Sequence, residues 1–234
     1  MEQIIVLHGS KDESRNEILA DRLDALMGEE LDYSVAFIES RERGVDQVIE
    51  KLTREGHHHF NIIPVLFFSA SHYCRDIPRA LDKVKERHDV EWALAPVLSH
   101  HPLMQHFIEK RISELPRWGA VMVMAHGNTD YKAADHEMED LLSRLETNRP
   151  IFPGMLKGRL SLDGVLPELG AQHDVLHVIP IALEDGFLTS KMKEAVMEHA
   201  KGMSVSFTAA VNFDPMLKGI IMDHMKSGEH GSRI

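Results

Sequence analysis

The sequence predicts an α/β protein made of two tandem, similar domains, each a parallel sheet flanked by helices. Short apolar runs, typical of strands buried on both faces, alternate with segments of helical period. That alternation implies parallel strands joined by helices. The same order of elements then returns about 115 residues further along, which matches a duplicated domain and is too long for a solenoid repeat.

The elements of the first half follow in chain order. Residues 3–7 are expected to form a short buried strand, after which His8-Gly9-Ser10 turns the chain into a helix over roughly residues 11–27. Ser10 and Glu13 have the spacing of a capping box at the start of that helix. The remaining expected elements are strands at 34–38, 60–66 and 91–95 and helices at 44–56, 77–87 and 102–114.

The second half repeats three segments of the first. The matching pairs are 4–10 with 120–128, 62–66 with 178–182, and 96–104 with 210–217. One unit duplicated with small deletions explains all three pairs. The expected division is an N-terminal domain over 1–115, a C-terminal domain over 119–226 and a loose polar tail over 227–234.

Composition excludes several classes of function. The net charge of −11 argues against a nucleic-acid partner, because phosphate binding needs a basic face. No run of about 18 apolar residues is present, so no membrane span is expected, and the start lacks the layout of a signal peptide. The single cysteine excludes an internal disulfide and fits a reducing compartment, so we expect a cytoplasmic protein.

Three chemically capable side chains come at or just after predicted strand ends in the first half: His8, Glu39 and His72. Open α/β sheets place their ligands at this edge. In the second half, His8 corresponds to His126, whereas Glu39 corresponds to about Lys157 and His72 to about Leu188. A purely structural role would be expected in both halves, so the asymmetry indicates that the first half carries out the chemistry.

Two imidazoles and one carboxylate suit a divalent metal ion such as Fe²⁺, Co²⁺, Ni²⁺ or Zn²⁺. They also suit proton abstraction, because a neutral imidazole titrates near neutral pH. Any one of the histidines, taken alone, is more simply explained as a packing residue. The three together, each at a strand end, indicate a functional site.

Three short motifs carry a family resemblance. His8-Gly9-Ser10, Phe37-Ile38-Glu39, and His72 followed by Asp76-Ile77-Pro78 resemble the motifs of the sirohydrochlorin chelatases, which are the ATP-independent (class II) tetrapyrrole chelatases. The chain departs from the family pattern at Leu7, where glycine is common, in the spacer 73–75 and in the turn 40–43. The resemblance covers both halves and implies a two-domain lyase whose active centre lies in the N-terminal half.

The resemblance also implies a reaction. A divalent ion, Fe²⁺ or Co²⁺ and by the same ligand logic Ni²⁺, would enter sirohydrochlorin or a related tetrapyrrole in siroheme or cobalamin biosynthesis, without ATP. His8 and His72 would bind the metal ion, and Glu39 would help to accept the two pyrrole protons. The macrocycle's carboxylates would need cationic or N–H partners from the protein. The alternative for the cationic candidates is that they are ordinary solvated side chains on a helix surface. The substrate-binding candidates are Ser10, Lys11, Arg15, Arg75 and Arg79.

Other questions stay open from the sequence. The run His57–His59 is expected to be solvated loop, Cys74 to be incidental, and His100 and His101 to lie at a further strand end. A non-catalytic metal or tetrapyrrole carrier is the rival function, since it would need the histidines and not the carboxylate base. The fused repeat predicts that a monomer provides the two-domain cleft, and a homodimer is also compatible.

Overall fold

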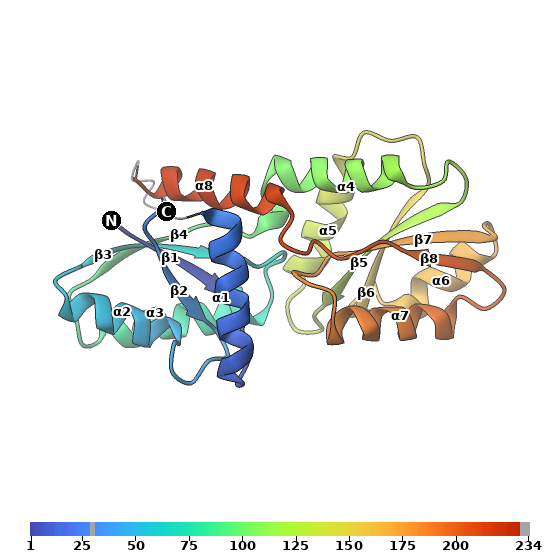
Figure 1. Ribbon diagram of the computed structural model, residues 1–234. Coiled ribbons are helices and arrows are strands. Elements are labelled where there is room, and N and C mark those ends of the chain that lie inside the picture. Colours follow the sequence, from blue (N-terminus) through green and yellow to red (C-terminus); the bar gives the residue numbers. More distant parts are fainter. Residues whose placement is uncertain (29–30, 230–234) are drawn as a thin grey trace. The chain divides into compact units, whose positions relative to one another are not determined.

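The computed structural model describes residues 1–28 and 31–229, which form two four-stranded sheets with helices packed on both faces (Figure 1). The strands are β1 (Glu2–Leu7), β2 (Ser34–Phe37), β3 (His59–Pro64), β4 (Glu91–Leu94), β5 (Ala120–Gly127), β6 (Ile151–Lys157), β7 (Val175–Pro180) and β8 (Ser204–Phe207). The helices are α1 (Glu13–Met27), α2 (Val45–Arg54), α3 (Ile77–Lys85), α4 (Pro102–Glu114), α5 (Ala133–Ser143), α6 (Leu162–Gly170), α7 (Phe187–His199) and α8 (Pro215–Glu229).

Both sheets have the same topology. The strand orders are β2-β1-β3-β4 and β6-β5-β7-β8, and every neighbouring pair is parallel. The predicted α/β class and the internal repeat are therefore confirmed. No helix within the described residues is long and apolar enough to cross a membrane.

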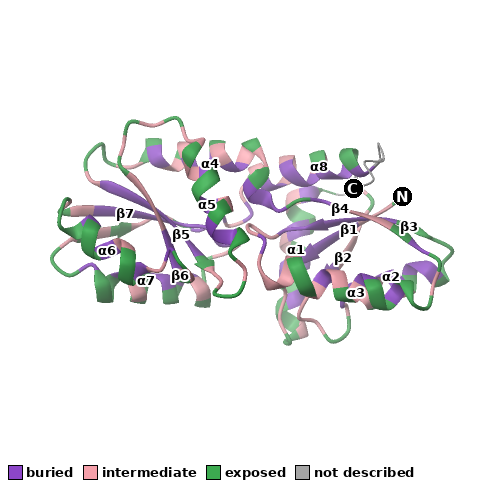
Figure 2. Cartoon of the chain, turned by 180° about the vertical axis from the view of Figure 1, so that it is seen from behind, coloured by how far each residue is buried: buried purple, intermediate pink, exposed green. Residues whose placement is uncertain are grey.

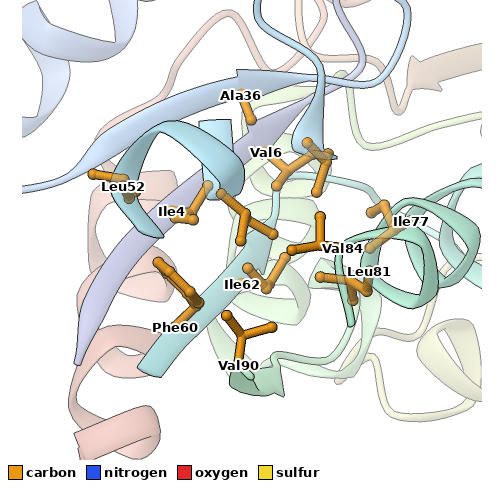
Figure 3. Close-up of a cluster of buried hydrophobic side chains, with 12 residues drawn as sticks. Ile4, Val6, Ala36, Leu52, Phe60, Ile62, Ile77, Leu81, Val84 and Val90 are labelled. Atoms are coloured by element: carbon orange, nitrogen blue, oxygen red, sulfur yellow. The ribbon is translucent and has the colours of Figure 1, made fainter. Parts of the chain in front are cut away.

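Each sheet is buried on both faces, as its apolar strands require. In the first sheet, Ile4 and Val6 of β1 pack with buried side chains of α2 and α3 (Figure 3). Alternate residues of a strand point to opposite faces, so the fully buried Ile5 and Leu7 face the other side, where α1 and α8 lie (Figure 1). Figure 2 shows the central strands of both sheets as almost continuously buried.

The division of the chain differs from the expected one. One compact unit consists of residues 1–98 together with 215–234, and the other of residues 99–214. The helix that follows each fourth strand therefore belongs to the other unit: α4 follows β4 but is part of the second unit, and α8 follows β8 but is part of the first. An amphipathic helix has the same sequence pattern whichever sheet it covers, so the pattern could not reveal this exchange.

The close packing of α8 on β3 is visible at one pair of residues. The side-chain amide of Asn61, which is 1% exposed, donates to the backbone carbonyl of His224 at 3.0 Å and to Gln3 Oε1 at 2.8 Å. Gly228 lies directly over this amide. The expected tail over 227–234 thus differs from the structure in its first three residues, which continue α8, while residues 230–234 lie outside the described part.

We expect Gly228→Ala to destabilise the protein, although alanine has the higher helix propensity. A Cβ atom at residue 228 would clash with the Asn61 side chain, and such overpacking costs about 1–3 kcal/mol. Gly164→Ala is the matched control, because a Cβ atom there meets nothing within 4 Å and should stabilise α6 by up to about 1 kcal/mol. Urea unfolding of both variants measures the difference, and equal stability changes would contradict the observed docking of α8.

Candidate metal centre

The three residues His8, Glu39 and His72, called the trio below, come together at the carboxyl edge of the first sheet. His8 directly follows β1, Glu39 follows β2 by two residues, and His72 opens the helical turn after β3. One ligand atom from each residue can be chosen such that all three lie within 4.8 Å of one another. The two imidazole rings are 4.5 Å apart between centroids and nearly perpendicular. Within residues 1–28 and 31–229, no other three or more His, Cys, Asp or Glu side chains converge in this way.

The backbone pairing of β1 with β2 places Glu39 beside His8. The parallel register Leu7↔Phe37 continues past the strands, since the N–H of Glu39 donates to the carbonyl of His8 at 3.1 Å. Gly9 makes the turn possible: its φ is +70°, and a Cβ atom there would lie 2.6 Å from the Cβ of Phe37. Only glycine accommodates both conditions.

Hydrogen bonds determine which ring nitrogens are free. The Nδ1 of His72 lies 2.8 Å from Oδ2 of Asp76, and the Nδ1 of His8 lies 3.0 Å from the carbonyl oxygen of Gly9. In the neutral rings Nδ1 must carry the hydrogen, because a carboxylate and a carbonyl only accept. Each Nε2 therefore keeps its lone pair for a metal ion, in the arrangement by which outer carboxylates orient metal-binding histidines.

Asp76 was missed as a functional residue by the sequence reasoning, although the signal was present. His72 and Asp76 are four residues apart, and residues at that spacing in a helix can meet on one face. The segment His72–Asp76 forms a π-helical turn, a rare conformation that often occurs at functional sites. Asp76 also accepts from Nε of Arg75 at 2.8 Å, so its carboxylate links the two side chains.

The electrostatics favour the metal-binding form of His72. Burial lowers the pKa of His72, as does the nearby positive charge of a protonated His8, and together they outweigh the opposing effect of Asp76. For Asp76, burial acts to raise the pKa, but the hydrogen bonds from Arg75 and His72 prevail and lower it. The ring of His72 is therefore neutral, and its carboxylate partner ionised, at neutral pH.

We expect His8→Ala to raise the pKa of His72 in the metal-free protein. The substitution removes a neighbouring positive charge and exposes the ring, and both changes favour protonation. An NMR titration of the His72 ring protons measures the shift, which should be upward toward the usual value of about 6.5. His58→Ala, at the opposite end of the sheet, is the control. An unchanged or lower His72 pKa in His8→Ala would contradict this account of the site's electrostatics.

Beside the trio lies an open hollow of about 400 Å³. The residues that line it are Lys11, Ile38, Glu39, His72, Asp76 and Arg79. Two cationic side chains, Lys11 and Arg79, thus share a surface with two members of the trio. Cations beside a metal site can hold the carboxylates of an anionic ligand close to the metal ion.

The other three predicted substrate-binding residues do not line this hollow. The backbone N–H and carbonyl of Ser10 both bond to the side chain of Asn16, and its hydroxyl accepts from the N–H of Asp12. Arg75 bonds to Asp76, and Arg15 lies exposed on α1. Their part in substrate binding stays a prediction.

The second unit has the same strand register as the first, but different side chains at the strand ends. In its sheet, Ala125 pairs with Met155 and Gly127 with Lys157, which is the register that pairs Leu7 with Phe37 in the first. Lys157 therefore stands where Glu39 stands, next to His126. By the same comparison, β7 ends at Pro180 as β3 ends at Pro64, and Leu188 of α7 takes the place of His72.

The other histidines singled out from the sequence, and Cys74, lie outside the trio. His101 caps α4 by accepting from the N–H of Leu103, and His100 pairs with Glu137 at 3.3 Å, all within the second unit. Cys74 is exposed and outside the trio. His57 and His59 pair with Glu2 and Glu91, and His58 bonds to the carbonyl of Asp89.

Known proteins are similar to this chain over the segment that contains the trio. Residues 2–115, which contain the trio, match the CbiX family. A sirohydrochlorin cobaltochelatase of Sulfolobus acidocaldarius is 26% identical over 129 residues, covering 55% of this chain and 97% of that protein. Another, from Sulfurisphaera tokodaii, is 25% identical over 114 residues, covering 49% of this chain and 92% of that protein.

Solved structures match the fold over nearly the whole chain. SirB from Bacillus subtilis with Fe³⁺ has a TM-score of 0.77 at 18% identity and covers 97% of this chain and 96% of that one. The sirohydrochlorin chelatase SirB from Bacillus subtilis subspecies spizizenii, in complex with cobalt, has a TM-score of 0.70 at 16% identity, covering 98% and 97% of the two chains. Residues 2–115 therefore belong to the CbiX family, and the chain as a whole has the chelatase-like fold of these structures.

Proposed function

We propose that the protein inserts a divalent metal ion, Fe²⁺ or Co²⁺, into sirohydrochlorin or a closely related tetrapyrrole without ATP. One observation carries the proposal: two imidazoles with free Nε2 lone pairs and one carboxylate converge at one sheet edge. Nitrogen and oxygen ligands of this kind accept Fe²⁺, Co²⁺ and Ni²⁺ alike. The relatives named for cobalt and the related structure with Fe³⁺ support the metal class.

The reaction needs both a metal holder and bases. Insertion replaces the two pyrrole N–H protons of the free macrocycle by M²⁺, so one metal ion enters and two protons leave. His8 and His72 present the ion through Nε2, and one of the two imidazoles accepts one pyrrole proton once the ion has moved to the macrocycle. Glu39 accepts the other proton and offsets the positive charge of the ion before transfer. Asp76 keeps His72 in the tautomer that this exchange requires.

The hollow supplies binding groups for the substrate. Lys11 and Arg79 line it together with Glu39 and His72, and we assign them to the peripheral carboxylates of the macrocycle. Charge-assisted bonds to carboxylates are about twice as strong as neutral ones. The first unit contains the whole trio, so the proposal needs no second copy of the chain.

Turnover separates a chelatase from a carrier. The purified protein is mixed anaerobically with Co²⁺ and a large excess of sirohydrochlorin, and the absorbance of the metallated product is followed against a protein-free control. A chelatase produces many equivalents of product per chain, faster than the control. A carrier stops at one bound equivalent, and that result would replace the proposed function by the carrier function.

A further inference from the structure

Two polar residues of α1 connect the loops that carry His8 and Glu39. These residues, Glu13 and Asn16, are called the brace below. Neither belongs to the trio, and neither lines the hollow beside it. Their hydrogen-bond partners, Ser10, Ser40 and Arg41, lie within two residues of His8 or Glu39.

Asn16 fixes the loop after β1. Its side chain is fully buried, and its Oδ1 accepts from the N–H of Ser10 at 2.8 Å. Its Nδ2 donates to the carbonyl of Ser10 and to Oε2 of Glu13, each at 2.8 Å. A buried amide whose donors and acceptor are paired in this way rigidifies the His8-Gly9-Ser10 turn.

Glu13 fixes the loop after β2. The sequence predicted a capping box between Ser10 and Glu13, but the N-cap is Asp12, whose carboxylate accepts from the N–H of Ser14. The carboxylate of Glu13 instead crosses to the other loop, where it accepts from the hydroxyl of Ser40 and from the N–H of Arg41, each at 2.9 Å. The hydrogen bond from Asn16 and those from the 40–42 loop lower the pKa of Glu13, so it stays ionised.

In the second unit, the two corresponding loops, after β5 and after β6, have different hydrogen bonds. There the loop after β6 is held by Asp135, whose Oδ2 accepts from the N–H of Arg159 at 3.4 Å. Its Oδ1 is buried and has no hydrogen-bond partner among the described residues. Asn128, in the loop after β5, bonds only within its own loop, to the N–H groups of Asp130 and Tyr131. Among the described residues, the paired side-chain network that reaches both loops lies in the unit that carries the trio.

We propose that Glu13 and Asn16 are positioning residues that set the distance between the ligand atoms of His8 and Glu39. The inference rests on the proposed function and adds two residues to its site. Both loops are already joined by the Glu39–His8 backbone bond, so the brace is not needed to form the sheet. It restricts where the two side chains point, which a metal ion requires and a fold does not.

The test uses Glu13→Ala, with Asp12→Ala as its matched control. Asp12 is the neighbouring carboxylate and caps the same helix, but its side chain bonds to Ser14 and does not reach the 40–41 loop. Co²⁺ binding is measured by titration of the visible d–d absorption of the metal ion, without any tetrapyrrole. Thermal unfolding and the kcat and KM of metal insertion are measured in parallel.

We expect Glu13→Ala to weaken Co²⁺ binding about 10- to 100-fold and to change the shape of the d–d band. Its kcat should fall while KM for the tetrapyrrole stays the same, and Glu13→Gln should recover part of the loss because its amide oxygen still accepts from Arg41. Asp12→Ala should lose stability and keep the Co²⁺ affinity and spectrum.

Equal Co²⁺ affinity and spectra in Glu13→Ala and Asp12→Ala would overturn the inference. Ser40→Ala, which removes the partner at the other end of the bond, gives the same comparison if Glu13→Ala does not fold. A wild-type protein that binds Co²⁺ but inserts none would instead refute the proposed function, and the brace would still be tested by the binding data.

Discussion

Replacing His72 by alanine is expected to remove both Co²⁺ binding and metal insertion. His72 supplies one of the two imidazole nitrogens of the trio, and its neutral form is favoured by burial. Outer partners of metal-binding histidines alone are worth about 10- to 100-fold in affinity or activity. The loss of the histidine itself should therefore exceed about 100-fold, as measured by Co²⁺ titration and by initial rates of insertion.

The control for this result is His58→Ala. His58 comes just before β3, at the amino end of the same strand that His72 follows, and its ring bonds to the carbonyl of Asp89. It should bind Co²⁺ and insert it as the wild type does. A His72→Ala protein that folds and still binds Co²⁺ with wild-type affinity would remove His72 from the metal centre.

Replacing Glu39 by glutamine should separate binding from chemistry. Glutamine has nearly the same shape but is a poor base, and general base catalysis contributes about 10²- to 10⁴-fold to rates. The two imidazoles remain, so Co²⁺ binding should weaken much less than the rate of insertion falls. Stopped-flow absorbance with saturating Co²⁺ and sirohydrochlorin measures the rate, and separate titrations measure the two affinities.

Two outcomes would change the role of Glu39. A loss of Co²⁺ affinity as large as the loss of rate would make Glu39 a metal ligand and no more. An unchanged rate would exclude Glu39 as the base and would leave the two imidazoles as the proton acceptors. Asp46→Asn is a suitable control, since Asp46 lies on α2 and pairs with Lys83.

The strands and the site edge were predictable because local pattern determines them. Buried parallel strands are apolar along their whole length, and chain direction then brings His8, Glu39 and His72 to one edge. The duplicated sequence also served as a comparison, and the sheet registers place Lys157 at the position of Glu39. These inferences need only periodicity and topology.

The partners of the trio were not predictable, because they depend on contacts across the fold. Glu13 has the spacing of a capping residue, yet its carboxylate bonds to a loop 27 residues away. The four-residue spacing of His72 and Asp76 allows a contact on one helical face, but the π-helical turn in which their bond forms had no sequence signal. The exchange of α4 and α8 between the two units likewise depends on which sheet each helix meets.

The most direct test compares the same substitution at equivalent strand ends of the two units. His8, just after β1, and His126, near the end of β5, occupy matching positions in the two sheets, but among the described residues the convergence with a carboxylate and a second histidine is found at His8. Initial rates of Co²⁺ insertion into sirohydrochlorin are measured anaerobically, without ATP, for His8→Ala and His126→Ala. Our account predicts that His8→Ala loses more than about 100-fold in rate and that His126→Ala keeps the wild-type rate. Equal losses in both variants, or wild-type activity in His8→Ala, would contradict a single working site in the first unit.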